Sequence, residues 1–229
     1  MGPDVLDKEV ASADEAIAGV RDGDVVLISG FGPPGQPDAL IDALVRTGVG
    51  GLTVVNNNAN AGGESITRLF ESGAVAKVVC SFPRGLNPRG FEELYRQGRI
   101  ELELVPQGTL AERIRAAGAG VEGFYTRTGY GTELQGDKET KEFDGKGYVL
   151  ERALHGDVAL VRASTGDRWG NLVYSKTARN FGPIMAMAAA ITAVEVTRIV
   201  DAPLDPEAVV TPGIYVDRLL QRRTSGDPA

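Results

Sequence analysis

The 229-residue sequence contains only one cysteine, Cys80, and one histidine, His155. A single cysteine excludes a disulfide within the chain and a metal cluster built on cysteines, and no spacing of His, Asp and Glu suggests a metal site. No apolar run approaches the ~18 residues of a membrane helix, and the first residues lack the charged-then-apolar pattern of a signal peptide. We therefore expect a cytoplasmic protein without a membrane partner.

Positive charge is also scarce. Lysine and arginine number 24 against 31 aspartate and glutamate residues, which gives a formal net charge of −7. No run of lysine or arginine stands out, so we expect no nucleic-acid partner. Apolar residues make up 42% of the chain, which is ordinary for a globular protein and sufficient for a sizeable core.

Short apolar runs alternate with segments of helical periodicity in the first half of the chain. Strands are predicted at 24–29, 52–58, 75–83 and 100–105, and helices at 37–48, 63–73, 91–98 and 109–118. Strands that alternate with helices of about ten residues indicate β-α-β units. The sequence therefore predicts an α/β fold with three layers and a mostly parallel sheet.

Capping signals predict where several helices begin. Ser12 with Glu15, and Thr109 with Glu112, have the spacing of a capping box. Pro37 suits the first position of its helix, because its backbone is already close to helical geometry.

The second half of the chain has a different pattern. Residues 132–154 are polar and rich in turn signals, including DGKG, and we expect a β-hairpin or flap there. Residues 157–164 and 193–201 are predicted strands that rejoin the sheet, with a helix at 180–191 between them. We expect one domain over residues 5–220, followed by a frayed tail at 221–229.

The segment LISGFGPPGQP, residues 27–37, contains G-x-G-x-x-G at Gly30, Gly32 and Gly35. A dinucleotide-binding turn needs its third glycine inside a helix and an acidic residue on the next strand. Here two prolines delay the helix and the next strand ends in asparagines. Two alternatives remain: a tight turn without a ligand, or a wide loop where open α/β sheets bind ligands.

Residues 22–37, DGDVVLISGFGPPGQP, resemble the signature of the family I CoA-transferases: Asp or Asn, Gly, three apolar positions, Gly-Gly-Phe, then Gly-x-Pro. The one departure is Ser29, which replaces the first glycine of Gly-Gly-Phe and is small enough to fit. The resemblance continues through VVNNNAN, VPQGTLAERIRAAGAGVEGFYTRTGYGT and GDRWGNLVYSKTARNFGPIMAMAA. It covers nearly the whole chain and is to the A subunit of the family. The segments KVVCSFPRG and GDRWGNL are most similar to the 3-oxoadipate enzymes of the family.

The resemblance implies an enzyme that moves CoA from succinyl-CoA to a 3-oxo acid, with 3-oxoadipate as the expected acceptor. A glutamate of the B subunit, in a Ser-Glu-Asn-Gly motif, carries CoA as a glutamyl thioester; that motif is absent from this chain. A heterotetramer of two A and two B subunits is expected, with the CoA thioester as substrate and no bound cofactor. The rival interpretations are a subunit for acetoacetate or another short 3-oxo acid, and a non-catalytic binding module.

Gln107 is the expected catalytic residue, because it follows a predicted strand and the resemblance makes it an oxyanion donor. Asn57 and Asn58 are expected to hold polar groups of the substrate or partner, or to build an asparagine turn. Arg84, in SFPRG, could bind the distal carboxylate of 3-oxoadipate, or lie on the surface or at a subunit contact. The glycine loop is expected near the acyl-CoA or the incoming carboxylate, through Gly30, Phe31, Gly32 and Gly35.

Other residues with functional side chains are weaker candidates. Glu64 resembles a nucleophile by its position after two glycines, but we expect a solvated acid in a first helical turn. We expect a turn or packing role for His155 and an inert, buried thiol at Cys80. Trp169 is expected to anchor a loop or contact a partner, and residues 128–132 to shape the active-site wall or close a loop.

Overall fold

The computed structural model describes residues 7–59, 63–84 and 90–222. Its main sheet has eight strands, and its path runs β11-β10-β8-β1-β2-β3-β4, with β9 paired to β8. All neighbours are parallel except β8 and β9. This confirms the predicted mostly parallel sheet. The bounds are β1 Val25–Ile28, β2 Leu52–Val55, β3 Val75–Cys80, β4 Glu101–Leu104, β8 Gly156–Asp167, β9 Leu172–Val173, β10 Ala189–Val200 and β11 Arg218–Gln221.

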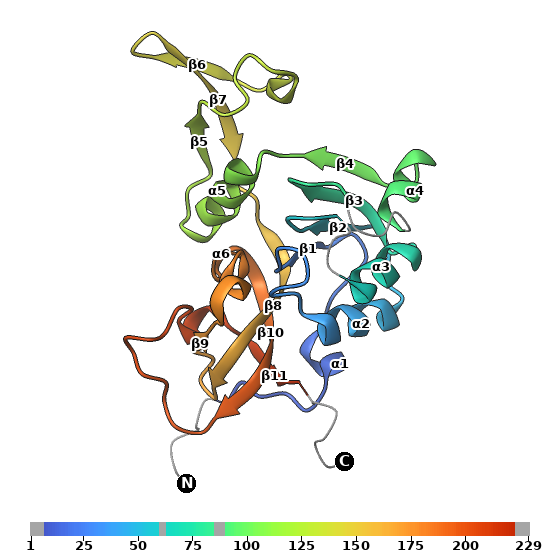
Figure 1. Ribbon diagram of the computed structural model, residues 1–229, viewed down its shortest axis with the longest axis vertical. Coiled ribbons are helices and arrows are strands. Elements are labelled where there is room, and N and C mark those ends of the chain that lie inside the picture. The colour runs from blue at the N-terminus through green and yellow to red at the C-terminus, as the bar shows by residue number, and fades with distance from the viewer. Residues whose placement is uncertain (1–6, 60–62, 85–89, 223–229) are drawn as a thin grey trace.

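Helices cover both faces of this sheet, which makes three layers (Figure 1). Consecutive residues of one strand, such as Val26 and Leu27, pack into separate apolar cores on opposite faces of the sheet, as the two-residue period of a strand requires. None of the helices in the described ranges is long and apolar enough to cross a membrane. One core holds α1 Ala13–Ala16, α2 Asp38–Thr47, α3 Glu64–Glu71 and α4 Phe91–Arg96, and the other holds α5 Gln107–Gly118 and α6 Gly182–Ala188.

A small antiparallel sheet projects from this body as an arm, residues 123–152 (Figure 1). It consists of β5 Gly123–Thr126, β6 Thr140–Phe143 and β7 Lys146–Arg152, with a 3-10 turn at Glu133–Gln135. The turn residues Asp144 and Gly145 have φ values of 50° and 70°, as Asp-Gly hairpin turns require. The predicted hairpin is therefore confirmed, although β5 lies before the predicted range.

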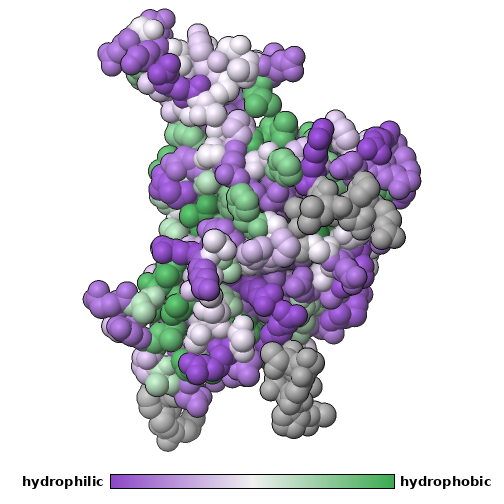
Figure 2. Space-filling view, in the orientation of Figure 1, coloured by the Kyte–Doolittle hydropathy of each residue, from purple (hydrophilic) through white to green (hydrophobic). Residues whose placement is uncertain are grey.

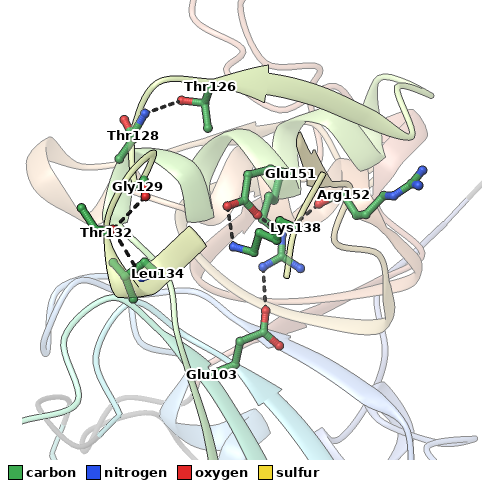
Figure 3. Close-up of polar contacts among 10 residues, drawn as sticks. Glu103, Thr126, Thr128, Gly129, Thr132, Leu134, Lys138, Glu151 and Arg152 are labelled. Carbon is green, nitrogen blue, oxygen red and sulfur yellow. Dashed lines mark hydrogen bonds and ion pairs between the residues drawn. The ribbon is translucent and has the colours of Figure 1, made fainter. Parts of the chain in front are cut away.

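Ion pairs and hydrogen bonds tie the arm to the body (Figure 3). Within the arm, the carboxylate of Glu151, buried on β7, accepts from Lys138 Nζ at 2.6 Å, and its other oxygen, Oε2, lies 4.0 Å from Arg113 Nε of α5. Arg113 of α5 donates through Nε to the carbonyl of Arg152 at 2.8 Å and through Nη1 to Glu103 Oε1 of β4 at 2.7 Å. The guanidinium thus connects the arm, α5 and the main sheet. These contacts fix the helix whose first residue is Gln107.

Two of the predicted helix starts need correction. The Ser12 cap is confirmed, since its Oγ accepts from the Glu15 N–H at 3.1 Å. The Thr109 cap is wrong: α5 begins at Gln107 after Pro106, and Thr109 is buried within its first turn. Pro37 lies one position before the first residue of α2. A proline just before a helix can start it without a side-chain cap.

The predicted helix at 180–191 is too long. It ends at Ala188, and β10 begins at Ala189, where Ala189 pairs with Gly156 and Ile191 with Val158. Pairing along β8 overrides the helix propensity of alanine. At the chain end, Gln221 closes β11 and the N–H of Arg222 donates to Val196, so the sheet continues into the predicted tail; residues 223–229 lie outside the described ranges.

Candidate functional site

Four loops meet at the carboxyl edge of the main sheet. Strands β1 to β4 are parallel neighbours, so the segments that follow them lie side by side (Figure 1). Ligands of open α/β sheets bind at this edge. The sequence-predicted site residues all follow one of these four strands, in segments 29–37, 56–58, 81–84 and 105–107.

Gln107 and Asn57 are hydrogen-bonded to each other. Gln107 Nε2 donates to Asn57 Oδ1 at 3.0 Å, and Ser81 Oγ donates to the same oxygen at 2.7 Å. Asn57 is completely buried, whereas Gln107 is exposed at the start of α5. An amide nitrogen carries two hydrogens, and the bond to Asn57 uses one. The second can therefore be donated to a group outside this chain.

The same hydrogen-bond chain reaches the glycine loop. Asn57 Nδ2 donates to Asn58 Oδ1 at 2.8 Å, and Asn58 Oδ1 also accepts from the backbone N–H of Gly32 at 3.1 Å. The structure therefore joins four of the predicted site residues, Gln107, Asn57, Asn58 and Gly32, in one continuous network. The side chains of Gln107, Asn57 and Asn58 are amides, which stay neutral at all working pH values.

An asparagine turn is present here, but its side chain is that of Asn56 and not that of Asn57 or Asn58, for which the turn is the alternative. Asn56 Oδ1 accepts from the Asn58 N–H at 2.8 Å, and Asn56 Nδ2 donates to the Ile28 carbonyl at 2.7 Å. Asn56 thus shapes the turn and fixes it to β1. The side chains of Asn57 and Asn58 are free to contact Gln107 and the glycine loop.

Ser29, the departure from the family signature, braces the glycine loop from inside. It is completely buried, its Oγ donates to the Gly35 carbonyl at 2.6 Å, and it accepts from the Arg162 N–H at 3.1 Å. Gly35 has a φ of +84°, and a Cβ there would lie 2.7 Å from the Ala178 carbonyl oxygen. The loop ends before α2 begins at Asp38, which agrees with the argument against a dinucleotide-binding turn.

Two aromatic side chains stand exposed at this edge. Phe31, at the tip of the glycine loop, is 49% exposed, and Phe82, after β3, is 52% exposed. Phe82 pairs with Asn58 through an isolated bridge. Figure 2 shows further apolar surface where the arm meets the body. Exposed aromatic side chains next to a polar network are typical of surfaces that bind a ligand or partner.

Arg84 lies on the surface at the same edge, away from the network. It borders a hollow of about 240 Å³ with Phe91, Tyr95 and Leu102. Within the described part of the chain, no hydrogen bond or ion pair joins it to Gln107, Asn57 or the glycine loop. Residues 85–89, which follow Arg84, lie outside the described ranges.

The weaker candidates take structural or solvated positions. The Glu64 side chain is 95% exposed and lies 3.5 Å from Arg68, as expected for a solvated helix acid. Cys80 is buried at the end of β3, and burial raises the pKa of its thiol to about 12. His155 Nε2 lies 3.3 Å from an exposed Glu122 oxygen. The described residues contain no cluster of His, Cys, Asp and Glu that could hold a metal ion.

Sequence reasoning missed three residues that build the site. Ser81 bonds Asn57, Arg162 bonds Ser29, and Asn180 bonds both Gly30 and Pro34. Asn180 lies about 150 residues from the loop that it contacts, so no local pattern could reveal it. The parallel pairing of β1 with β8 brings Arg162 beside Ser29, and that of β2 with β3 brings Ser81 beside Asn57.

A model of the coenzyme A transferase family matches residues 10–222. The chain belongs to this family. It is 52% identical to the A subunit of 3-oxoadipate CoA-transferase of Pseudomonas putida and 54% identical to that of Acinetobacter baylyi, over 94% of this chain and 94–95% of theirs. It is 51% identical to the A subunit of succinyl-CoA:3-ketoacid coenzyme A transferase of Xanthomonas campestris, over 95% of this chain and 90% of that one.

Solved structures of CoA-transferases share the fold of this transferase chain. An acyl-CoA transferase of Escherichia coli O157:H7, in a thioester complex with CoA, superposes with a TM-score of 0.81 at 25% identity. The match covers 95% of this chain and 47% of that one, so this chain spans about half the length of that transferase. Glutaconate coenzyme A-transferase of Acidaminococcus fermentans superposes at 0.80 with 20% identity, which shows the shared fold alone.

Proposed function

We propose that this chain is the A subunit of an enzyme that moves CoA from succinyl-CoA to 3-oxoadipate. The observation that carries the proposal is the identity of 52–54% to the A subunits of two 3-oxoadipate enzymes over nearly their whole length. The exposed amide of Gln107 at the carboxyl edge supports it. The enzyme uses the CoA thioester as a substrate and works in the cytoplasm.

The reaction needs a second chain, the B subunit, for its nucleophile. A glutamate carboxylate of the B subunit attacks the succinyl-CoA carbonyl, and the CoA thiolate leaves to give a mixed anhydride. The thiolate then attacks the glutamyl carbonyl, which releases succinate and leaves a glutamyl-CoA thioester. The acceptor carboxylate reverses these two steps, so every bond broken on the donor is formed on the acceptor.

Gln107 is proposed to stabilise the oxyanion that forms at each attack. One of its amide N–H groups is held by the buried oxygen of Asn57, which leaves the other for the oxyanion. A donor that is already oriented costs no reorganisation when the negative charge develops. An amide also stays neutral across the working pH range. Asn57 and Asn58 act as the support for this donor, and the glycine loop is proposed to lie against the acyl group.

Arg84 is proposed to select the acceptor. A guanidinium can bind the distal carboxylate of 3-oxoadipate, which acetoacetate lacks, and Arg84 is exposed at the same edge as Gln107. Replacing it by Met is expected to lower kcat/KM for 3-oxoadipate about 10- to 100-fold and to leave acetoacetate unchanged. Arg46→Met is a matched control, since Arg46 of α2 forms an exposed pair with Asp14. Equal losses with both acceptors contradict the assignment.

A 3-ketoacid acceptor is the second candidate, because the identity to the A subunit of such an enzyme is 51%. The deciding experiment co-expresses the chain with a neighbouring reading frame that encodes Ser-Glu-Asn-Gly. The purified complex, expected to contain two copies of each subunit, is assayed with succinyl-CoA and either acceptor. Faster transfer to 3-oxoadipate supports the proposal, and faster transfer to acetoacetate favours the second candidate. An assembled complex that transfers CoA to neither acceptor favours a binding module.

A further inference from the structure

The side chain of Asn180 holds the glycine loop at two backbone groups, which are different from the one that Asn58 contacts. Asn180 lies between a 3-10 turn at Lys176–Arg179 and α6. Its Oδ1 accepts from the Gly30 N–H at 3.1 Å, and its Nδ2 donates to the Pro34 carbonyl at 2.9 Å. These two backbone groups lie on either side of the loop tip at residues 31–33. A single amide therefore fixes both ends of the tip.

The hydrogen-bonding capacity of Asn180 is fully used. Oδ1 also accepts from the Phe181 N–H at 2.7 Å, and Nδ2 also donates to the Thr177 carbonyl at 2.8 Å. Two bonds accepted and two donated are the complement of a primary amide. The bonds to Thr177 and Phe181 fix the side chain to its own segment. The bonds to Gly30 and Pro34 fix the loop to that segment. The geometry requires an amide, since a carboxylate cannot donate and an aliphatic side chain can do neither.

Close packing supports the same contact. A Cβ on Gly35 would lie 2.8 Å from Asn180 Nδ2 and 2.7 Å from the Ala178 carbonyl oxygen. The loop backbone therefore lies directly against the segment that carries Asn180, and only a glycine allows this approach.

The contact reaches Gln107 through a short series of hydrogen bonds. Gly30, held by Asn180, precedes Gly32 by two residues, and the Gly32 N–H donates to Asn58 Oδ1. Asn58 Oδ1 accepts from Asn57, and Asn57 accepts from Gln107. The loop thus bonds to two amide side chains, Asn180 and Asn58, and Asn58 belongs to the Gln107 network.

We propose that Asn180 is a positioning residue, which holds the glycine loop at the distance that keeps Asn58, Asn57 and Gln107 in their catalytic orientation. The inference rests on the proposed CoA-transferase function. Asn180 does not touch the reacting atoms in this account. Its loss should therefore lower kcat by a larger factor than it changes the KM for succinyl-CoA, whose acyl group the loop is proposed to contact.

The test compares Asn180→Asp and Asn180→Ala in the complex with the B subunit. Displacing a catalytic group by about 1 Å can cost about 100-fold in rate. We therefore expect both variants to lose about 10- to 100-fold in kcat at pH 8. A protonated carboxyl can donate to Pro34 again. The activity of Asn180→Asp relative to wild type should therefore rise as the pH falls, whereas that of Asn180→Ala should stay flat.

Gln135→Glu is the matched control, because it makes the same amide-to-acid change on the arm and keeps the oxygen that accepts from the Gly131 N–H. It should retain wild-type kcat. Variants with kcat within twofold of wild type, or a flat pH ratio for Asn180→Asp, would overturn the inference. A merely structural role would instead lower the fraction of complex that forms the thioester, with normal turnover in the remainder.

Hydrogen–deuterium exchange tests the contact without activity. Amides in 29–37 should exchange about five- to tenfold faster in Asn180→Ala, as expected for the loss of about 1–1.4 kcal/mol of hydrogen bonding, and the arm should be unchanged. Unchanged exchange in the loop would overturn the inference. An inactive wild-type complex would contradict the proposed function instead, and the exchange result would still decide the role of Asn180. If Asn180→Ala fails to assemble, Asn180→Asp, which keeps both accepted bonds, takes its place.

Discussion

Replacing Gln107 by alanine is expected to lower kcat of the assembled transferase about 10²- to 10³-fold, or about 2.7–4 kcal/mol, the cost of removing one oxyanion donor. The effect on stability should be small. Gln107 is exposed and its side chain makes one bond, to Asn57, so the loss should stay near 1 kcal/mol. Asn57 Oδ1 keeps the bond from Ser81 after the substitution, which avoids an unpaired buried oxygen.

Two further variants serve as a control and as a change of charge at the same position. Gln97→Ala, on the exposed surface after α4, removes one amide bond to Glu93 and should leave kcat unchanged. Gln107→Glu should be at least as inactive as Gln107→Ala, because a carboxylate there repels Asn57 Oδ1 and the developing oxyanion. Steady-state kinetics with succinyl-CoA and 3-oxoadipate measure all three, with thermal unfolding of each complex as the control. A kcat of Gln107→Ala within threefold of wild type would refute the oxyanion role.

Three further predictions concern titratable groups. Burial alone would raise the pKa of Glu103, but hydrogen bonds from Arg113 and Lys77 outweigh burial and lower that pKa. The stabilisation from these bonds is present above about pH 4.5 and is lost as the pH falls. Glu103→Gln should therefore flatten the acid side of a Tm-against-pH curve, and an unchanged slope would count against the pairing. Burial raises the pKa of Glu195, so the contribution of this group to stability is full below about pH 4.5 and declines as the pH rises. The Tm of Glu195→Gln should therefore increase relative to that of wild type as the pH rises. A constant difference in Tm would show that Glu195 does not cause this loss of stability. Because burial raises the pKa of Cys80 to about 12, iodoacetamide at pH 8 should label the thiol only after denaturation, and rapid labelling of the native complex would contradict its burial.

The sequence predicted the carboxyl-edge site because its residues follow strands with strong apolar patterns. Parallel strands necessarily bring their carboxyl ends to one edge, so Asn57, Asn58 and Gln107 could be placed together before their contacts were known. Pro33 and Pro34 likewise predict that the glycine loop is not helical, and α2 begins only at Asp38.

The features that the sequence did not predict depend on distant contacts. Ala189 begins a strand because it pairs with Gly156, against the local helical preference. Thr109 has the sequence signal of a helix cap, but α5 begins two residues earlier, at Gln107. Asn180 gave no local signal because its partners lie about 150 residues away. At Ala189, a tertiary contact outweighs a helical preference worth less than about 1 kcal/mol per residue.

The division of labour between two chains is tested most directly by locating the covalent intermediate. The purified complex is incubated with succinyl-CoA and no acceptor, and the intact mass of each chain is then measured. We expect an adduct with the mass of CoA less one water on the B subunit, with this chain unmodified. The same adduct on this chain, for instance at Glu64, would contradict the claim that it supplies the oxyanion donor and not the nucleophile.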